Sequence, residues 1–270
     1  MNLYISVILR SEIYAEKFFS LLEEDGRLGL EIFPFCHAEG YMELLDRLLP
    51  RLGEFPVTFH EPYYDADHSY GKGSPEYQIT MDHCKNILDR AAKLNAGYVV
   101  FHLNNREVPA RTCPERDEML ENALANFAEM EEMASERGLK LLIENSGVPS
   151  WNNVLLGEDE FVNLFQNVGC GCLIDTGHAN CNGWDLSSVI ARLRHRIRSY
   201  HLHNNFGLID DHFRIFDGTF GMAAFFEDYA KYTPDADIVF EYSPELMEGD
   251  IGWLKEDIAS VRRMTSPVLA

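Results

Sequence analysis

The chain of 270 residues lacks the features that mark membrane, secreted and disulfide-stapled proteins. No apolar run comes near the roughly 18 residues needed to cross a bilayer, so we expect no membrane span. The N-terminus, MNLYISVILR, has an arginine after its apolar run instead of a basic segment before it, which does not fit a secretory signal. The six cysteines lack disulfide-scaffold spacing in a chain too large to need stapling. We therefore expect a cytoplasmic protein with free thiols.

Positive charge is also scarce. The 23 Lys and Arg stand against 44 Asp and Glu, which gives a formal charge of -21. A net negative field disfavours the approach of a polyanion, so we expect no nucleic-acid partner. Internal repeats and low-complexity segments are absent, and a hydrophobic content of 46% is enough to bury a large core. We therefore interpret residues 1–270 as a single domain.

Strand-like apolar runs alternate with helical patterns along the whole chain. The first pair is LYISVIL followed by SEIYAEKFFSLLEEDG, and the eighth is DIVFEY followed by GDIGWLKEDIASVRRM. Eight such pairs predict an α/β protein with a single (β/α)8 TIM barrel, whose active groups lie at the C-terminal ends of the strands. Pro75 after Ser74, and Pro114, predict helix starts, while Gly138 predicts a helix stop.

Six of the predicted strands end in a residue that ionises. These residues are His60, His102, Glu144, Asp175, His201 and Glu241. A buried strand end carries an ionisable side chain only when that group is paired or coordinated, so six of them suggest one converging polar site. A single glutamate at a strand end is more often a salt-bridged end group, but six ends together favour a divalent metal. Imidazole and carboxylate ligands without cysteine argue against a structural zinc finger.

Short motifs surround these strand ends. In chain order they read GLEIF, FHEPY, VFHLN, LLIENSG, LIDTGHAN, SYHLHNN, DDHF and IVFEYSP. In this order the chain resembles the xylose isomerase-like barrel superfamily over nearly its whole length. That superfamily includes sugar and sugar-phosphate isomerases and epimerases, and also the endonuclease IV hydrolases. The resemblance implies a divalent metal cofactor, such as manganese, cobalt, magnesium or zinc.

The resemblance implies different metal ligands in its two branches. In the isomerase and epimerase branch, one metal is held by Glu144, Asp175, His201 and Glu241. His178 of the DTGH motif would then contact the substrate. In the endonuclease branch the same four bind zinc, and further zinc positions are implied at His60, His102, His178, Asp210 and His212. This chain has a candidate at all nine positions.

Two departures favour the isomerase branch. The His-x-Ser-x-x-Gly-Gly pattern at the endonuclease N-terminus is missing, because the first strand continues into ILRSEI. The last marker reads HFRIFDG, with Gly218 retained but Phe216 where another glycine would fall.

Proton transfer next to a carbonyl needs a base near the carbon and positive charge near the oxygen. Glu144 and Glu241 follow the fifth and eighth predicted strands, so they can approach a substrate from different sides. We expect them to act as base and acid, in an undetermined order. The predicted protein is therefore a metal-dependent isomerase or epimerase that converts a ketose, keto-acid or related sugar through an enediolate. The alternatives are a multinuclear zinc phosphodiester hydrolase and a sugar-binding or regulatory barrel without turnover.

Several other residues are candidates for substrate contact. We expect His60, His102, His178 and Arg214 to bind a small sugar or sugar-like molecule. The sequence leaves open whether the protein forms a homo-oligomer. It also leaves open the roles of a further set of residues: Glu31, His203, Arg106, Arg111, Trp151, Trp184, and the loop tyrosines Tyr63, Tyr64 and Tyr70.

Overall fold

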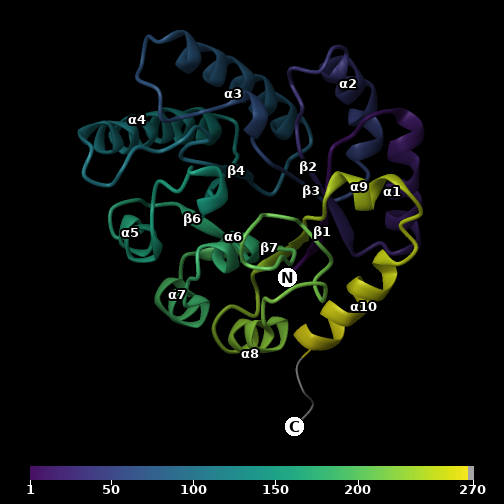
Figure 1. The fold of residues 1–270 in the computed structure, drawn as a ribbon. Coiled ribbons are helices and arrows are strands. Elements are labelled where there is room, and N and C mark those ends of the chain that lie inside the picture. Colours follow the sequence, from purple (N-terminus) through teal and green to yellow (C-terminus); the bar gives the residue numbers. More distant parts are fainter. Residues whose placement is uncertain (267–270) are drawn as a thin grey trace.

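The computed structural model describes residues 1–266. Eight parallel strands follow one another around a closed barrel, and the first strand pairs with the last (Figure 1). The strands are β1 (Leu3–Val7), β2 (Leu28–Ile32), β3 (Val57–Phe59), β4 (Val99–Phe101), β5 (Leu141–Glu144), β6 (Gly171–Asp175), β7 (Ile197–Leu202) and β8 (Asp237–Phe240). The predicted (β/α)8 barrel is therefore confirmed.

Helices form a ring around the barrel (Figure 1). They are α1 (Glu12–Glu24), α2 (Tyr41–Leu52), α3 (Pro75–Lys93), α4 (Pro114–Glu136), α5 (Glu158–Leu164), α6 (Thr176–Cys181), α7 (Leu186–Leu193), α8 (Met222–Tyr232), α9 (Pro244–Glu248) and α10 (Leu254–Thr265). The predicted ends are confirmed, because Pro75 and Pro114 open their helices and Gly138, at φ +72°, follows the end of α4. The side chain of Ser74 caps α3 by accepting from the backbone N–H of Tyr77.

The side chains that point into the barrel form two layers. Alternation along a strand places Val100 and His102 on the same side, and likewise Leu142 with Glu144 and Leu173 with Asp175. The apolar members of these pairs pack together with Tyr98 as a separate buried cluster. An apolar layer inside the barrel thus supports a layer of ionisable groups at the C-terminal ends of the strands.

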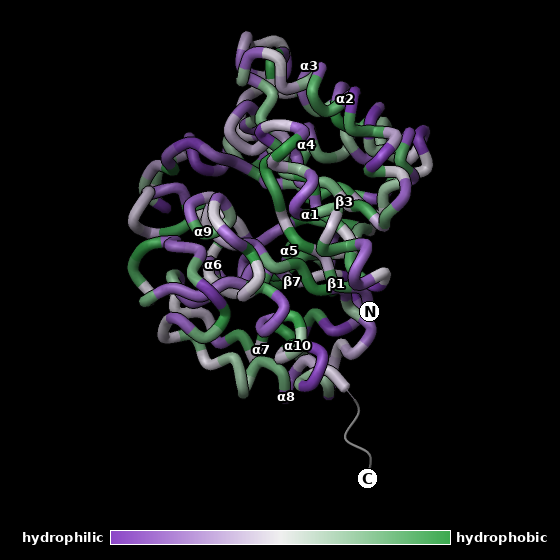
Figure 2. Tube along the Cα trace, turned by 90° about the vertical axis from the view of Figure 1, so that its right-hand side faces the viewer, coloured by the Kyte–Doolittle hydropathy of each residue, from purple (hydrophilic) through white to green (hydrophobic). Residues whose placement is uncertain are grey.

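Hydropathy follows this arrangement. Figure 2 shows hydrophobic strands in the middle of the molecule, with the short helices α6 and α9 on one side and the N-terminus on the other. Within residues 1–266, we find no helix with both the length and the apolar character needed to cross a membrane. All six cysteines are free thiols, as predicted.

Candidate metal centre and active site

The four side chains predicted to hold the catalytic metal meet at the mouth of the barrel. Nδ1 of His201 lies 3.0 Å from Glu241 Oε2, 3.4 Å from Glu144 Oε2 and 3.8 Å from Asp175 Oδ2. All four side chains are buried, yet neither ring nitrogen of His201 has a hydrogen-bond partner with suitable geometry. Three carboxylates around one imidazole nitrogen need a positive charge among them. The donor set therefore fits a divalent metal.

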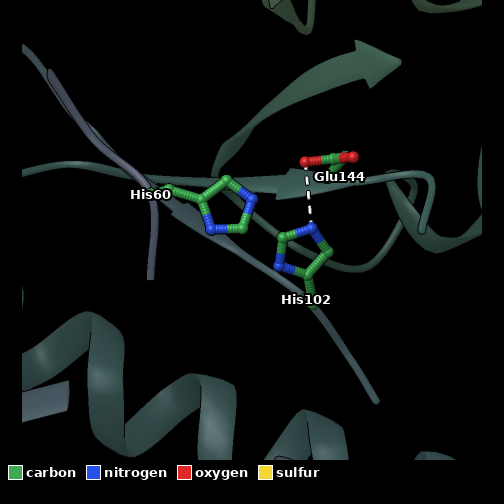
Figure 3. Close-up of side chains that lie close together, drawn as sticks. All are labelled: His60, His102 and Glu144. Carbon is green, nitrogen blue, oxygen red and sulfur yellow. Dashed lines mark hydrogen bonds and ion pairs between the residues drawn. The ribbon is translucent and has the colours of Figure 1, made fainter. Parts of the chain in front are cut away.

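A second group stands at the ends of β3, β4 and β5. Nε2 of His102 lies 3.0 Å from Glu144 Oε2, and the ring of His60 stacks on that of His102 at 4.6 Å between centroids (Figure 3). The ligand atoms of His60, His102 and Glu144 all lie within 4.8 Å of one another, so this group could also hold a metal.

A third group stands beside α6. Oδ2 of Asp210 is 3.1 Å from His178 Nε2 and 2.9 Å from His212 Nε2. Nδ1 of His178 is also 3.1 Å from Glu144 Oε1, so Glu144 is common to all three groups. The backbone of His212 has a φ of +50°, a region that costs a non-glycine residue energy. The structure thus brings together all nine positions that the resemblance pointed to.

The local fold explains how Asp175 and His178 are placed. Asp175 ends β6 and caps α6, because its Oδ1 accepts from the backbone N–H of His178 at 2.6 Å. Asn145 bonds both backbone groups of Asp175, at 2.7 and 3.1 Å. β6 ends at Asp175 and α6 carries His178, so these two elements fix the positions of both side chains.

His203 and Glu31 lie behind the first group. Nε2 of His203 bonds both carboxylate oxygens of Asp175, at 3.1 and 3.0 Å, which holds that carboxylate in place. Its ring packs so closely on Gly177 that a Cβ there would lie 1.9 Å from the imidazole. Glu31 lies 3.0 Å from His201 Nε2, on the side away from the other carboxylates. Both residues thus contact candidate metal ligands from outside the group, a position that the sequence left open.

Arg214 does not join the site. Its guanidinium makes a two-point ion pair with Asp257, at 3.0 and 2.7 Å, and lies over the ring of Trp253. Arg106 is likewise bonded to Ser69, and Arg111 to Glu160. Arg10 lies at the cavity wall instead and pairs with Glu248. The sequence analysis did not single it out, although it follows the first strand.

The cavity above these groups has a volume of about 310 Å³. Aromatic side chains form much of its wall: Phe33, Tyr63, Tyr64, Trp151 and Tyr242. Tyr70 instead packs under the Arg106 guanidinium, and Trp184 packs against Phe161. Two of the three loop tyrosines and one of the two tryptophans thus face the space where a substrate would lie.

Burial and mutual contact shift the pKa values of these groups. Burial opposes the charged form of His102, but Glu144 and Glu61 outweigh it and raise its pKa to about 9. In the same way Asp210 raises the pKa of His212 to about 10. The pKa of Glu144 is held well below its usual range by His102 and His201 despite burial. Without a metal, protons on His102 and His212 supply positive charge among the carboxylates. The pKa of His60 is instead lowered, because burial and the neighbouring His102 oppose its charged form.

These shifts predict that the metal-free protein loses stability as pH rises. A histidine whose pKa is about 6.5 unfolded and about 9 folded stabilises fully below pH 6.5, and this contribution disappears as pH rises through 9. For His102 the loss is on the order of 3 kcal/mol. Urea unfolding in the presence of chelator from pH 6.5 to 10 measures it. A free energy of unfolding that stays level or rises would contradict the prediction. Metal-loaded protein is the control, because its metal replaces the protons.

The fold and the site match a known family. The chain belongs to the xylose isomerase-like TIM barrel family, whose family model matches residues 16–262. An uncharacterized protein of Sinorhizobium fredii is 29% identical over 52% of this chain and 45% of its own length, so the chain spans less than half of that relative. An uncharacterized protein of Methanocaldococcus jannaschii is 24% identical over 74% of this chain and 67% of its own length.

Solved structures share the fold across both branches of the family. A D-tagatose 3-epimerase-like protein superposes with a TM-score of 0.74 at 20% identity, covering 98% of this chain and 100% of its own. Endonuclease IV from Thermus thermophilus superposes with a TM-score of 0.63 at 17% identity, covering 96% of this chain and 100% of its own. At these identities the likeness concerns the fold.

Proposed function

We propose that the protein is a divalent-metal-dependent isomerase or epimerase acting on a ketose, keto-acid or related sugar. The observation that supports it most is that Glu144 and Glu241 flank one imidazole, that of His201, at the cavity of about 310 Å³. This volume is at the lower end for small-molecule sites, which suits a monosaccharide. The likeness to a D-tagatose 3-epimerase-like protein points to the same chemistry.

The chain's own residues divide the work of such a reaction. Glu144, Asp175, His201 and Glu241 would hold the metal, which supplies positive charge to an enediolate oxygen when bound. Glu144 lies on β5 and Glu241 follows β8, and each would take or return a proton on its own side of a sugar. The aromatic wall around Tyr63 and Trp151 packs against the sugar and limits the access of water.

A second candidate is a multinuclear zinc phosphodiester hydrolase. The observation in its favour is that all three ligand groups exist and share Glu144. The formal charge of -21 stands against a polyanionic substrate such as DNA. We therefore place this function second.

A metal count combined with an exchange assay separates the candidates. The isomerase predicts about one tightly held divalent ion per chain, because four mixed ligands with open positions complete a catalytic site. It also predicts that deuterium from heavy water enters the product of a ketohexose. Metal analysis of protein purified without chelator, followed by mass spectrometry of incubated sugars, measures both. Three zinc ions with phosphodiester cleavage would refute the isomerase, and sugar binding without deuterium uptake would indicate a barrel without turnover.

A further inference from the structure

Glu61 lies behind the two histidines at the ends of β3 and β4 and is itself fully enclosed. Only 2% of its surface is exposed. Its Oε1 accepts from the backbone N–H of His102 at 2.9 Å and lies 3.0 Å from His102 Nδ1, while its Oε2 lies 3.0 Å from His68 Nε2. A buried carboxylate persists only where hydrogen bonds satisfy it, and here two imidazoles and one amide do so.

Glu61 contacts the Nδ1 atom of His102 and also the Nδ1 atom of His60. Its carboxylate faces Nδ1 of His102 at 3.0 Å, and its backbone carbonyl faces Nδ1 of His60 at 2.8 Å. Carboxylate and carbonyl oxygens only accept hydrogen bonds, so both Nδ1 atoms must carry the proton. In Figure 3 the second ring nitrogen of His102 points away from Glu144, whereas Nε2 points toward it.

His68 makes the support rigid. It is fully buried, its ring stacks on Phe101 at 4.1 Å, and its backbone carbonyl accepts from the Asn126 side chain at 2.7 Å. Since Glu61 Oε2 can only accept, His68 presents an Nε2–H to it. The carboxylate is thereby held between two imidazole rings and cannot turn away from His102.

We propose that Glu61, backed by His68, is a positioning residue that fixes His60 and His102 with the proton on Nδ1. The side chain of Glu61 fixes His102, and its backbone fixes His60. Nε2 of each ring is thereby directed at the cavity side, where it can face a sugar hydroxyl or a metal ion. The inference rests on the proposed function insofar as these two histidines belong to the proposed site.

Nitrogen-15 NMR of the histidines in full-length, metal-loaded protein tests this arrangement. Signals are assigned with His60→Gln and His102→Gln. The wild-type protein should show a protonated Nδ1 on His102 that exchanges slowly with water. Glu61→Leu should lose this resonance, because no acceptor remains. The Nδ1–H of His60 serves as an internal control and should persist, since its acceptor is a backbone carbonyl.

Glu61→Gln provides a second variant that keeps the shape of the side chain. The amide oxygen should stay with His102, where two N–H groups converge, so the His102 resonance should survive. The amide nitrogen then faces His68, whose proton should move from Nε2 to Nδ1. If the side chain at position 61 only filled space, Glu61→Gln would leave the proton of His68 on Nε2.

Three results would overturn the proposal. They are an unprotonated Nδ1 on His102 in the wild type, an unchanged His102 resonance in Glu61→Leu, and an unchanged His68 in Glu61→Gln. If Glu61→Leu does not fold by circular dichroism, the wild type and Glu61→Gln decide. The proposed function can fail independently of this arrangement. In that case the wild-type protein would show no sugar turnover, although its His102 still carried a proton on Nδ1.

Discussion

Replacing Glu144 or Glu241 with glutamine should lower turnover by at least ~10², because the amide keeps the size and one ligating oxygen but cannot accept the proton. Both carboxylates face His201 at the cavity and are poised in the charged form, since the neighbouring histidines lower their pKa values despite burial. Steady-state kinetics together with sugar binding measure the effect, and binding should remain.

The matched control for this experiment is Glu245→Gln. Glu245 also lines the cavity, but it is exposed and lies on α9, outside the three ligand groups. The same chemical change there should leave turnover near the wild-type value. Near-normal turnover in Glu144→Gln or Glu241→Gln would remove that residue from the roles of acid and base.

Replacing His60 or His102 with alanine should separate the two candidate functions. In the isomerase, both imidazoles face the substrate, so either change should raise KM or lower turnover while the bound-metal content stays constant. In the hydrolase, each is a metal ligand of the group shared with Glu144, so either change should empty a metal position and abolish cleavage. Metal analysis and kinetics on the same preparations distinguish these outcomes.

His195→Ala controls for the loss of an imidazole, since His195 is exposed between α7 and β7, at the other end of the barrel.

Binding to duplex DNA with an abasic site should be negligible at physiological salt, given the charge of -21. Tight, salt-sensitive binding to that duplex, together with metal loss in His60→Ala, would establish the hydrolase instead.

The barrel was predictable because buried apolar runs alternate with longer helical patterns eight times along the chain. The short helices α6 and α9 escaped prediction, since five or six residues complete too few turns to show a period of 3.6. They matter to the site, because α6 carries His178 and Pro244 of α9 lines the cavity.

Six of the nine candidate ligands were visible in the sequence because they lie at or next to the ends of strands. The other three, His178, Asp210 and His212, lie on α6 and in the segment after β7, and only the resemblance pointed to them. The arginine contacts were not visible in the sequence, since only the folded chain brings Asp257 of α10 to Arg214.

Glu61 was missed for a different reason. It follows His60 immediately, and alternation along a strand predicts that it points away from the barrel interior. Its contact with His102 depends on how β3 and β4 lie side by side, which no local pattern reveals.

The close packing of His203 on Gly177 has a bearing on how this barrel can change its substrate. Any larger residue at position 177 would displace the His203 ring, which holds the Asp175 carboxylate in place. The floor of the site, where Asp175 and His203 lie, therefore tolerates little change in side-chain size. Tyr64 and Trp151 on the rim are 56% and 49% exposed, and therefore carry few such constraints. New specificities should arise by exchanging these rim residues, while the floor keeps its chemistry unaltered.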